Sequence, residues 1–231
     1  WWISGWMFAR NNDGIVGARF QDQTLAVFDA VTGRQQGASI QLDPSTGPDP
    51  NSVGLSPDGR WLCAYTYGIT KFWLWDALTG EERLAVSIEG RGESDFDFSA
   101  DGRLLSVAGR DEVRLWSLPD CVPTIPPIVV EQASGALFAR FSPDSRHLAV
   151  IDRRSGIQLH DTTTGARLRP RIDAEEGFDS KAWEFSPDGR LLHVGSKASA
   201  IRDLPAGRVT ALPFSQRDKH STGKSFSRNG R

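Results

Sequence analysis

Short apolar runs alternate with polar turn residues along the chain, and a turn signal recurs about every ten residues. In many runs the apolar residues occupy both alternating sets of positions, most clearly in Phe72-Trp73-Leu74-Trp75. A strand with one face in water would alternate apolar and polar residues, so these strands are expected to be buried on both faces. No long stretch has the period of a helix. The pattern therefore predicts an all-β protein of short antiparallel strands, packed between neighbouring sheets.

Two turn motifs recur with a common period of about 43 residues. The first has the order apolar-Ser-Pro-Asp-Gly-Arg. Its copies begin at Leu55, Phe98, Phe141, Phe185 and Phe226, and a degenerate copy begins at Phe8. The second has the order Asp-x-x-Thr-Gly and follows an aromatic residue in its clearest copies. These copies begin at Phe28-Asp29 and Trp75-Asp76, and weaker ones lie at Trp116, His160-Asp161 and Arg202-Asp203.

The first motif has the chemistry of a type I turn. Proline sets φ at the second position, aspartate suits the third, and glycine accepts positive φ at the fourth. The apolar residue before the turn ends a first strand. Second strands are predicted at 61–66, 104–108, 147–151 and 191–194, third strands at 71–75, 113–116 and 157–160, and a fourth strand, for example, at 83–88.

Repeats of four short antiparallel strands with two apolar faces predict a β-propeller of four-stranded blades. We expect one partial propeller over 1–231, with about five blades plus the first strand of a sixth. The predicted repeats are 1–47, 48–90, 91–132, 133–176, 177–218 and a partial repeat at 219–231. The extra first strand before the turn at Phe226 leads us to expect a piece of a longer propeller.

The Trp75-Asp76 dipeptide and the 43-residue period resemble the WD-repeat family. The strong Ser-Pro-Asp-Gly turns are similar to bacterial WD-repeat regions, which often accompany kinase or nucleotide-hydrolysing signalling domains. The family's Gly-His dipeptide is missing, and its aspartate six residues before the tryptophan is matched only by Asp22 before Phe28. The expected residues of the repeat core are Phe28, Trp75, Trp116, His160, Phe98, Phe141 and Phe185.

The resemblance implies a non-catalytic scaffold or sensor that binds proteins or peptides, and further blades and a signalling domain in the same parent chain. The candidate face is formed by the loops between second and third strands and between a fourth strand and the next first strand. Its candidate residues are Tyr67, Arg91, Arg110, Asp111, Arg153, Arg154, Glu175, Glu176, Lys197 and Arg217.

Composition and motifs add few alternatives. The net charge of −2 gives no sign of nucleic-acid binding, and no apolar run is long enough for membrane insertion. Cys63 and Cys121 are expected to be free thiols in a reducing, cytoplasmic compartment. No metal-ligand spacing, phosphate loop or nucleophile motif occurs, so we predict no catalytic residue, metal or cofactor.

An enzymatic or ligand-binding propeller of lactonase-like, quinoprotein-like or TolB-like type is the alternative. Such a protein needs acidic, histidine or metal ligands that converge on the central channel. The predicted first strands hold no repeated acidic or histidine residue of this kind.

Overall fold

The computed structural model describes residues 6–11, 14–21, 24–42, 53–65, 71–87, 95–131, 133, 137–152, 156–168, 172, 183–194, 198–203 and 208–215. Within these ranges every regular element is a β-strand, and every strand pair is antiparallel. The prediction of an all-β protein is confirmed. The part of the chain that the structure describes contains no helix able to cross a membrane.

The described strands form five sheets that follow one another along the chain, and in each sheet the strands are consecutive in sequence. Sheet A contains β1 (Trp6–Asn11), β2 (Gly14–Gln21), β3 (Thr24–Asp29) and β4 (Gln35–Gln41). Sheet B contains β5 (Val53–Leu55), β6 (Trp61–Tyr65), β7 (Lys71–Asp76) and β8 (Glu82–Ser87). Sheet C contains β9 (Asp95–Phe98), β10 (Leu104–Ala108), β11 (Glu112–Ser117), β12 (Val122–Pro123) and β13 (Ile128–Val129). Sheet D contains β14 (Leu137–Phe141), β15 (His147–Asp152) and β16 (Gly156–Asp161), and sheet E contains β17 (Trp183–Phe185), β18 (Leu191–Val194), β19 (Ala198–Asp203) and β20 (Arg208–Ser215).

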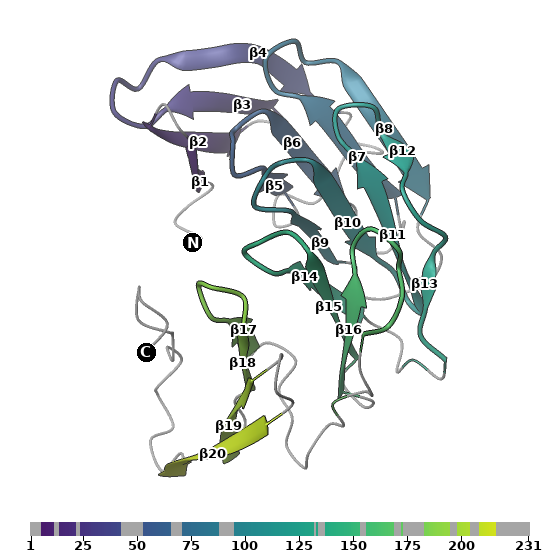
Figure 1. The fold of residues 1–231 in the computed structure, drawn as a ribbon. Helices are drawn as coiled ribbons and strands as arrows, with labels where there is room; N and C mark the ends of the chain where they lie inside the picture. The colour runs from purple at the N-terminus through teal and green to yellow at the C-terminus, as the bar shows by residue number, and fades with distance from the viewer. Residues whose placement is uncertain are drawn as a thin grey trace.

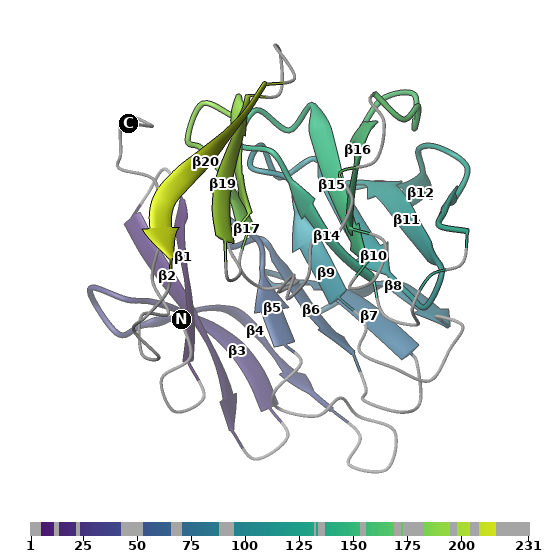
Figure 2. The ribbon, with the colours of Figure 1, turned by 90° about the horizontal axis from the view of Figure 1, so that it is seen from below.

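The sheets are arranged in an arc in the order of the sequence (Figure 1). The first strand of each sheet lies on the inner side of the arc, and the last strand lies on the outer side. Figure 2, the view from below, shows the same succession of sheets. Among the described strands, none of sheet A pairs with a strand of sheet E.

The core consists of apolar clusters that each lie between two neighbouring sheets. Between sheets A and B, Leu25 and Val27 belong to the same cluster as Trp73 and Trp75. The two indole rings are stacked, with their centroids 6.4 Å apart. The cluster between sheets B and C includes Phe72. A third cluster joins sheet C to sheet D, and a fourth joins sheet D to sheet E.

Strand β7 shows why both alternating sets of positions are apolar. Successive side chains of a strand point to opposite faces, so Trp73 and Trp75 pack toward sheet A while Phe72 and Leu74 pack toward sheet C. Burial of each such side chain contributes about 1.5–3 kcal/mol. A sheet with two apolar faces therefore requires a neighbour on each side.

The predicted strand limits agree closely with the structure. Strands β10 and β18 have the predicted bounds, and each of the other predicted second, third and fourth strands differs by no more than one residue at either end. The apolar residue before each Ser-x-Asp turn is the last residue of β5, β9, β14 or β17. In the first repeat, β1 continues past Phe8 to Asn11, which lies opposite Gly14, so the strand does not end before Phe8 as predicted.

In sheet D the described residues form three strands, and most of the segment after the turn at Gly165, where a fourth strand was predicted, lies outside the described residues. The fourth position there holds two isolated bridges, Ile157 with Ile172 and His160 with Arg167. In sheet C the fourth position is divided into β12 and β13, on either side of Pro126 and Pro127. Proline has no N–H to donate, so a proline-containing segment cannot form an unbroken ladder. The predicted sixth first strand, within 219–231, lies outside the described residues.

Candidate functional site

The Ser-x-Asp turns are held by a hydrogen-bond pattern that repeats in four sheets. The serine is completely buried in each copy, and its hydroxyl donates to the aspartate two residues later at 2.5–2.6 Å. These pairs are Ser56 and Asp58, Ser99 and Asp101, Ser142 and Asp144, and Ser186 and Asp188. The pKa of Asp188 lies below its ordinary value because the Ser186 hydroxyl and the Arg190 amide donate to it.

Neighbouring turns also contact each other along the arc. A Cβ added to Gly102 would lie 3.1 Å from a carboxylate oxygen of Asp58. The Asp101 amide donates to the Ser145 hydroxyl at 3.3 Å. These turns are held by hydrogen bonds within each turn and by contacts with the turn of the next repeat. The backbone that carries the following arginine is therefore rigid.

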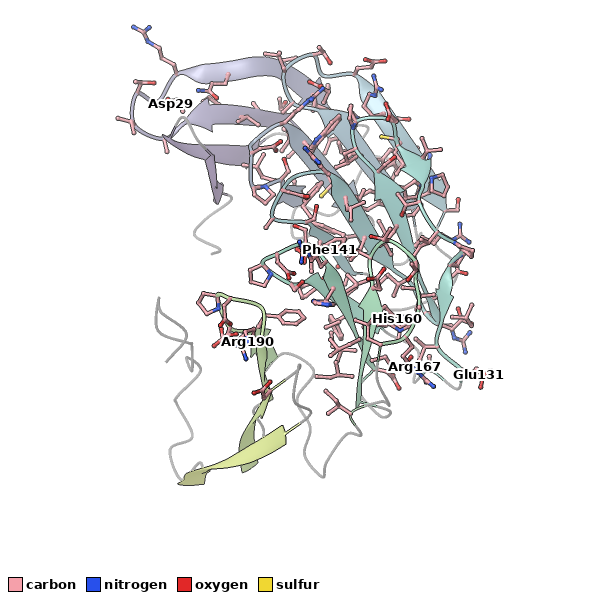
Figure 3. The ribbon with its side chains drawn as sticks, in the orientation of Figure 1. Asp29, Glu131, Phe141, His160, Arg167 and Arg190 are labelled. Carbon is pink, nitrogen blue, oxygen red and sulfur yellow. The ribbon has the colours of Figure 1, made fainter. Side chains whose placement is uncertain are left out.

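The repeat-core residues fall within the sheets. Trp75, Trp116, His160, Phe98 and Phe141 are buried, and Phe28 and Phe185 are half-buried. His160 lies beside Arg167 (Figure 3), and its Nδ1 is 3.0 Å from the Gly165 carbonyl oxygen. Its Nε2 is buried without a hydrogen-bond partner. Burial lowers the pKa of His160, so the ring is neutral near pH 7.

Of the predicted interaction residues, Arg110 and Asp111 lie in the described part of the chain. Both are exposed in the turn between β10 and β11. The Gly109 amide donates to the Glu112 carbonyl at 2.9 Å, and the Gly109 carbonyl accepts from the Leu137 amide at 3.2 Å. This second bond joins the turn to the start of β14. The predicted residues outside the described ranges are Tyr67, Arg91, Arg153, Arg154, Glu175, Glu176, Lys197 and Arg217.

A small, shallow hollow lies beside this turn, between sheets B and C. Its lining residues are Val86, Ser87, Val107, Gly109, Glu112, Arg114 and Trp116. The ion pair of Glu112 with Arg114, 2.5 Å between Oε1 and Nη2, is partly exposed to solvent. The hollow thus combines an apolar lining with a charged pair, next to Arg110 and Asp111.

A second group of charged residues lies on the inner strands and was not predicted from the sequence. Asp95 and Asp97 of β9 reach across to the edge of β14 that has no strand partner in sheet D. Asp95 accepts from the Ala139 amide at 3.2 Å and forms an ion pair with Arg140. Asp97 accepts from the Phe141 amide at 2.8 Å. The two carboxylates therefore satisfy edge amides that would otherwise be free to pair with another strand.

Burial dominates the protonation of these two carboxyl groups. It raises the pKa of Asp97 to about 7, although Arg140 and the Phe141 amide act in the opposite direction. It also raises the pKa of Asp95, again opposed by Arg140. One guanidinium thus faces two carboxyl groups that share a poorly hydrated site, and the pair holds a proton at a higher pH than exposed carboxylates do.

The sequence contained a signal for this group, in the alternation of Asp95 and Asp97 with Phe96 and Phe98. The complete Asp-Phe-Asp-Phe alternation occurs in one repeat only. The position of Asp97, two residues before the turn serine, holds Gly54 in β5, Arg140 in β14 and Glu184 in β17. Two of these four positions are acidic, Asp97 and Glu184, and the other two are glycine and arginine, so the position does not stand out as a repeated acidic site.

The described residues contain no group of three or more acidic, histidine or cysteine side chains that could hold a metal ion. Asp95 and Asp97 are instead occupied by backbone amides and Arg140. No protein-family model matches the chain, and no curated protein matches it.

Proposed function

We propose that the chain is an arc of β-propeller blades of the WD-repeat type, which acts as a non-catalytic scaffold or sensor for proteins or peptides. In this proposal the five sheets are blades, and the parent chain supplies further blades and a signalling domain. Both cysteines are free, with Cys63 buried and Cys121 half-buried, which fits a reducing, cytoplasmic compartment.

The observation that carries the proposal is the use of both faces of each central sheet for packing. Strands β7, β10 and β15 each contribute buried side chains to two inter-sheet clusters. With the faces buried in this way, the ends of the sheets remain as the surfaces on which a partner can bind.

The end that carries Arg110 and Asp111 supports the proposal further. Both side chains are exposed on a turn whose backbone is tied to β14, and the hollow between sheets B and C lies beside them. The mixed charges of Arg110, Asp111 and the Glu112–Arg114 ion pair suit the polar rim of a protein interface.

The test compares the two ends of the sheets in a binding experiment. Arg91→Glu, Arg110→Glu and Arg153→Glu together reverse the charge at the proposed face. Arg60→Glu, Arg103→Glu and Arg146→Glu together make the same change at the Ser-x-Asp turns, at the opposite end of the second strands. We expect the first triple variant to lose the proteins that the unmodified chain captures, and the control triple variant to retain them.

Retention of every captured protein by the first triple variant would reject this face. Loss in both triple variants would also count against it, because the effect would then be one of net charge. Stoichiometric metal in the purified protein would favour the enzymatic or ligand-binding alternative.

A further inference from the structure

The inner strands of sheets C and D meet through polar contacts, which we call the inner seam. The inner seam consists of Asp95 and Asp97 of β9, Arg140, and the backbone amides of Ala139 and Phe141. All of these contacts connect β9 to β14 across about one repeat of sequence. No strand ladder connects these two strands, so the side chains alone bridge them at this edge.

The apolar contacts between the same two sheets form a cluster that adjoins the inner seam, because it contains the buried side chains of Ala139 and Phe141. That cluster joins Val113 and Leu115 of β11 to Leu137, Leu148 and Val150 of sheet D. Opening of the inner seam therefore means that the two carboxyl groups release the Ala139 and Phe141 amides while the side chains of these residues stay packed in the apolar cluster.

The charges of the inner seam do not balance when both carboxyl groups are ionised. Asp95 and Asp97 lie on the same face of β9, two residues apart, and Arg140 is the one cation that contacts them among the described residues. The Asp95 side chain is 16% exposed and the Arg140 side chain 43% exposed, so solvent screens this excess negative charge only in part. A proton on the pair removes the excess, and a protonated carboxyl can still accept the Phe141 amide through its carbonyl oxygen.

We propose that the inner seam is a proton-sensitive contact, closed when the Asp95–Asp97 pair holds one proton and loosened when both carboxyl groups are ionised. The inner edge of β14 is then freed in response to pH, while the fold as a whole persists. This inference does not depend on the proposed function, and its test requires no partner.

The other groups that face Asp97 do not account for the pH dependence of the inner seam. Cys63 of β6 lies close enough to interact with it electrostatically, but burial raises the pKa of this thiol far above neutral pH. Ser106 of β10, which lies opposite Asp97 in the ladder, does not titrate. Arg140 keeps its charge throughout. The titration near neutral pH is therefore assigned to Asp97, because burial raises the pKa of this carboxyl group to about 7.

The direction of the effect follows from the proton balance. In the closed seam the pKa of Asp97 is about 7, and in the open seam it returns toward 3.8. The closed state binds more protons between these values, so the opening constant rises with pH by up to about tenfold per pH unit. Above pH 7 the opening constant reaches a plateau.

Hydrogen exchange at single amides, corrected for the intrinsic effect of pH, measures this opening. We expect the opening constant of the Phe141 amide to rise between pH 5 and pH 7 and then to level off. The Ser142 amide, which donates to the His147 carbonyl at 2.9 Å in the ladder of sheet D, is expected to stay protected. The matching variant is Asp97→Asn, which keeps an oxygen acceptor and cannot ionise.

In Asp97→Asn the pH dependence of the Phe141 amide is expected to disappear. Asp101→Asn is the control, because Asp101 also accepts a backbone amide but lies at an exposed turn outside the seam. If the opening constant of the Phe141 amide in Asp97→Asn kept the pH dependence of the unmodified protein, the proposal would be overturned. An equal rise at the Ser142 amide of the unmodified protein would also overturn it, because that result indicates global unfolding.

Discussion

Ser145 shows how a single residue departs from its motif and remains compatible with it. The fourth residue of the turn has positive φ in each described copy, 73° at Gly59, 69° at Gly102, 70° at Gly189 and 61° at Ser145. A residue with a Cβ is strained in this conformation, and the cost is about 1–2 kcal/mol. The Ser145 hydroxyl offsets part of this cost, because it accepts the Asp101 amide of the preceding repeat.

Substitution of Ser145 separates the strain from the hydrogen bond. Ser145→Ala keeps the Cβ and loses the acceptor, so we expect a loss of about 1 kcal/mol in the free energy of unfolding. Ser145→Gly loses the same acceptor but relieves the strain, so its stability should stay within about 0.5 kcal/mol of the unmodified protein. Urea unfolding of the two variants measures the difference. Equal stability of Ser145→Ala and Ser145→Gly would show that the backbone at this position is not strained.

At the scale of the strand, Gly54 of β5 is required by the approach of the next sheet. A Cβ at this position would lie 2.2 Å from the Phe96 ring and 2.8 Å from the Cys63 sulfur. The Phe96 ring is also in contact with the Phe72 and Phe98 rings, which limits its freedom to move away. The absence of a side chain at Gly54 thus sets how closely β9 can approach β5.

Gly54→Ala is expected to destabilise the protein by about 1–3 kcal/mol through overpacking. Phe96→Leu makes space at the same contact, so the double variant should lose less stability than the sum of the two single variants. Thermal or urea unfolding of the unmodified protein, the two single variants and the double variant gives the coupling free energy between positions 54 and 96. Additive losses would mean that Gly54 is needed for a reason other than the Phe96 ring.

Strand limits were predictable because the information for them is local. Each turn motif fixes the end of one strand and the start of the next, as at Phe98 and Leu104. The inner seam was not predictable in this way, because the Asp97 carboxylate and the Phe141 amide that it binds are 44 residues apart in sequence. Arg110 and Asp111 were predicted from the general rule that functional residues lie on loops. This rule predicts that their side chains are exposed, but it does not predict the hollow beside them.

At the scale of the whole molecule, the sheets form a linear array in which each core cluster joins two neighbours. In such an array stability is the sum of the stabilities of single units and of nearest-neighbour contacts. The charged contacts follow the same rule, since Asp95 and Asp97 connect sheet C to sheet D alone. A local defect is therefore expected to weaken two adjacent sheets more than distant ones.

Two core substitutions at different places along the arc test this expectation. Trp75→Ala removes a buried side chain between sheets A and B and should cost about 3–5 kcal/mol, while Leu148→Ala removes one between sheets C and D and should cost about 2–5 kcal/mol. Amide hydrogen exchange should then lose protection mainly in sheets A and B for the first variant and mainly in sheets C and D for the second. A uniform loss in both variants would indicate one cooperative unit, in which the inner seam could not open independently of the rest.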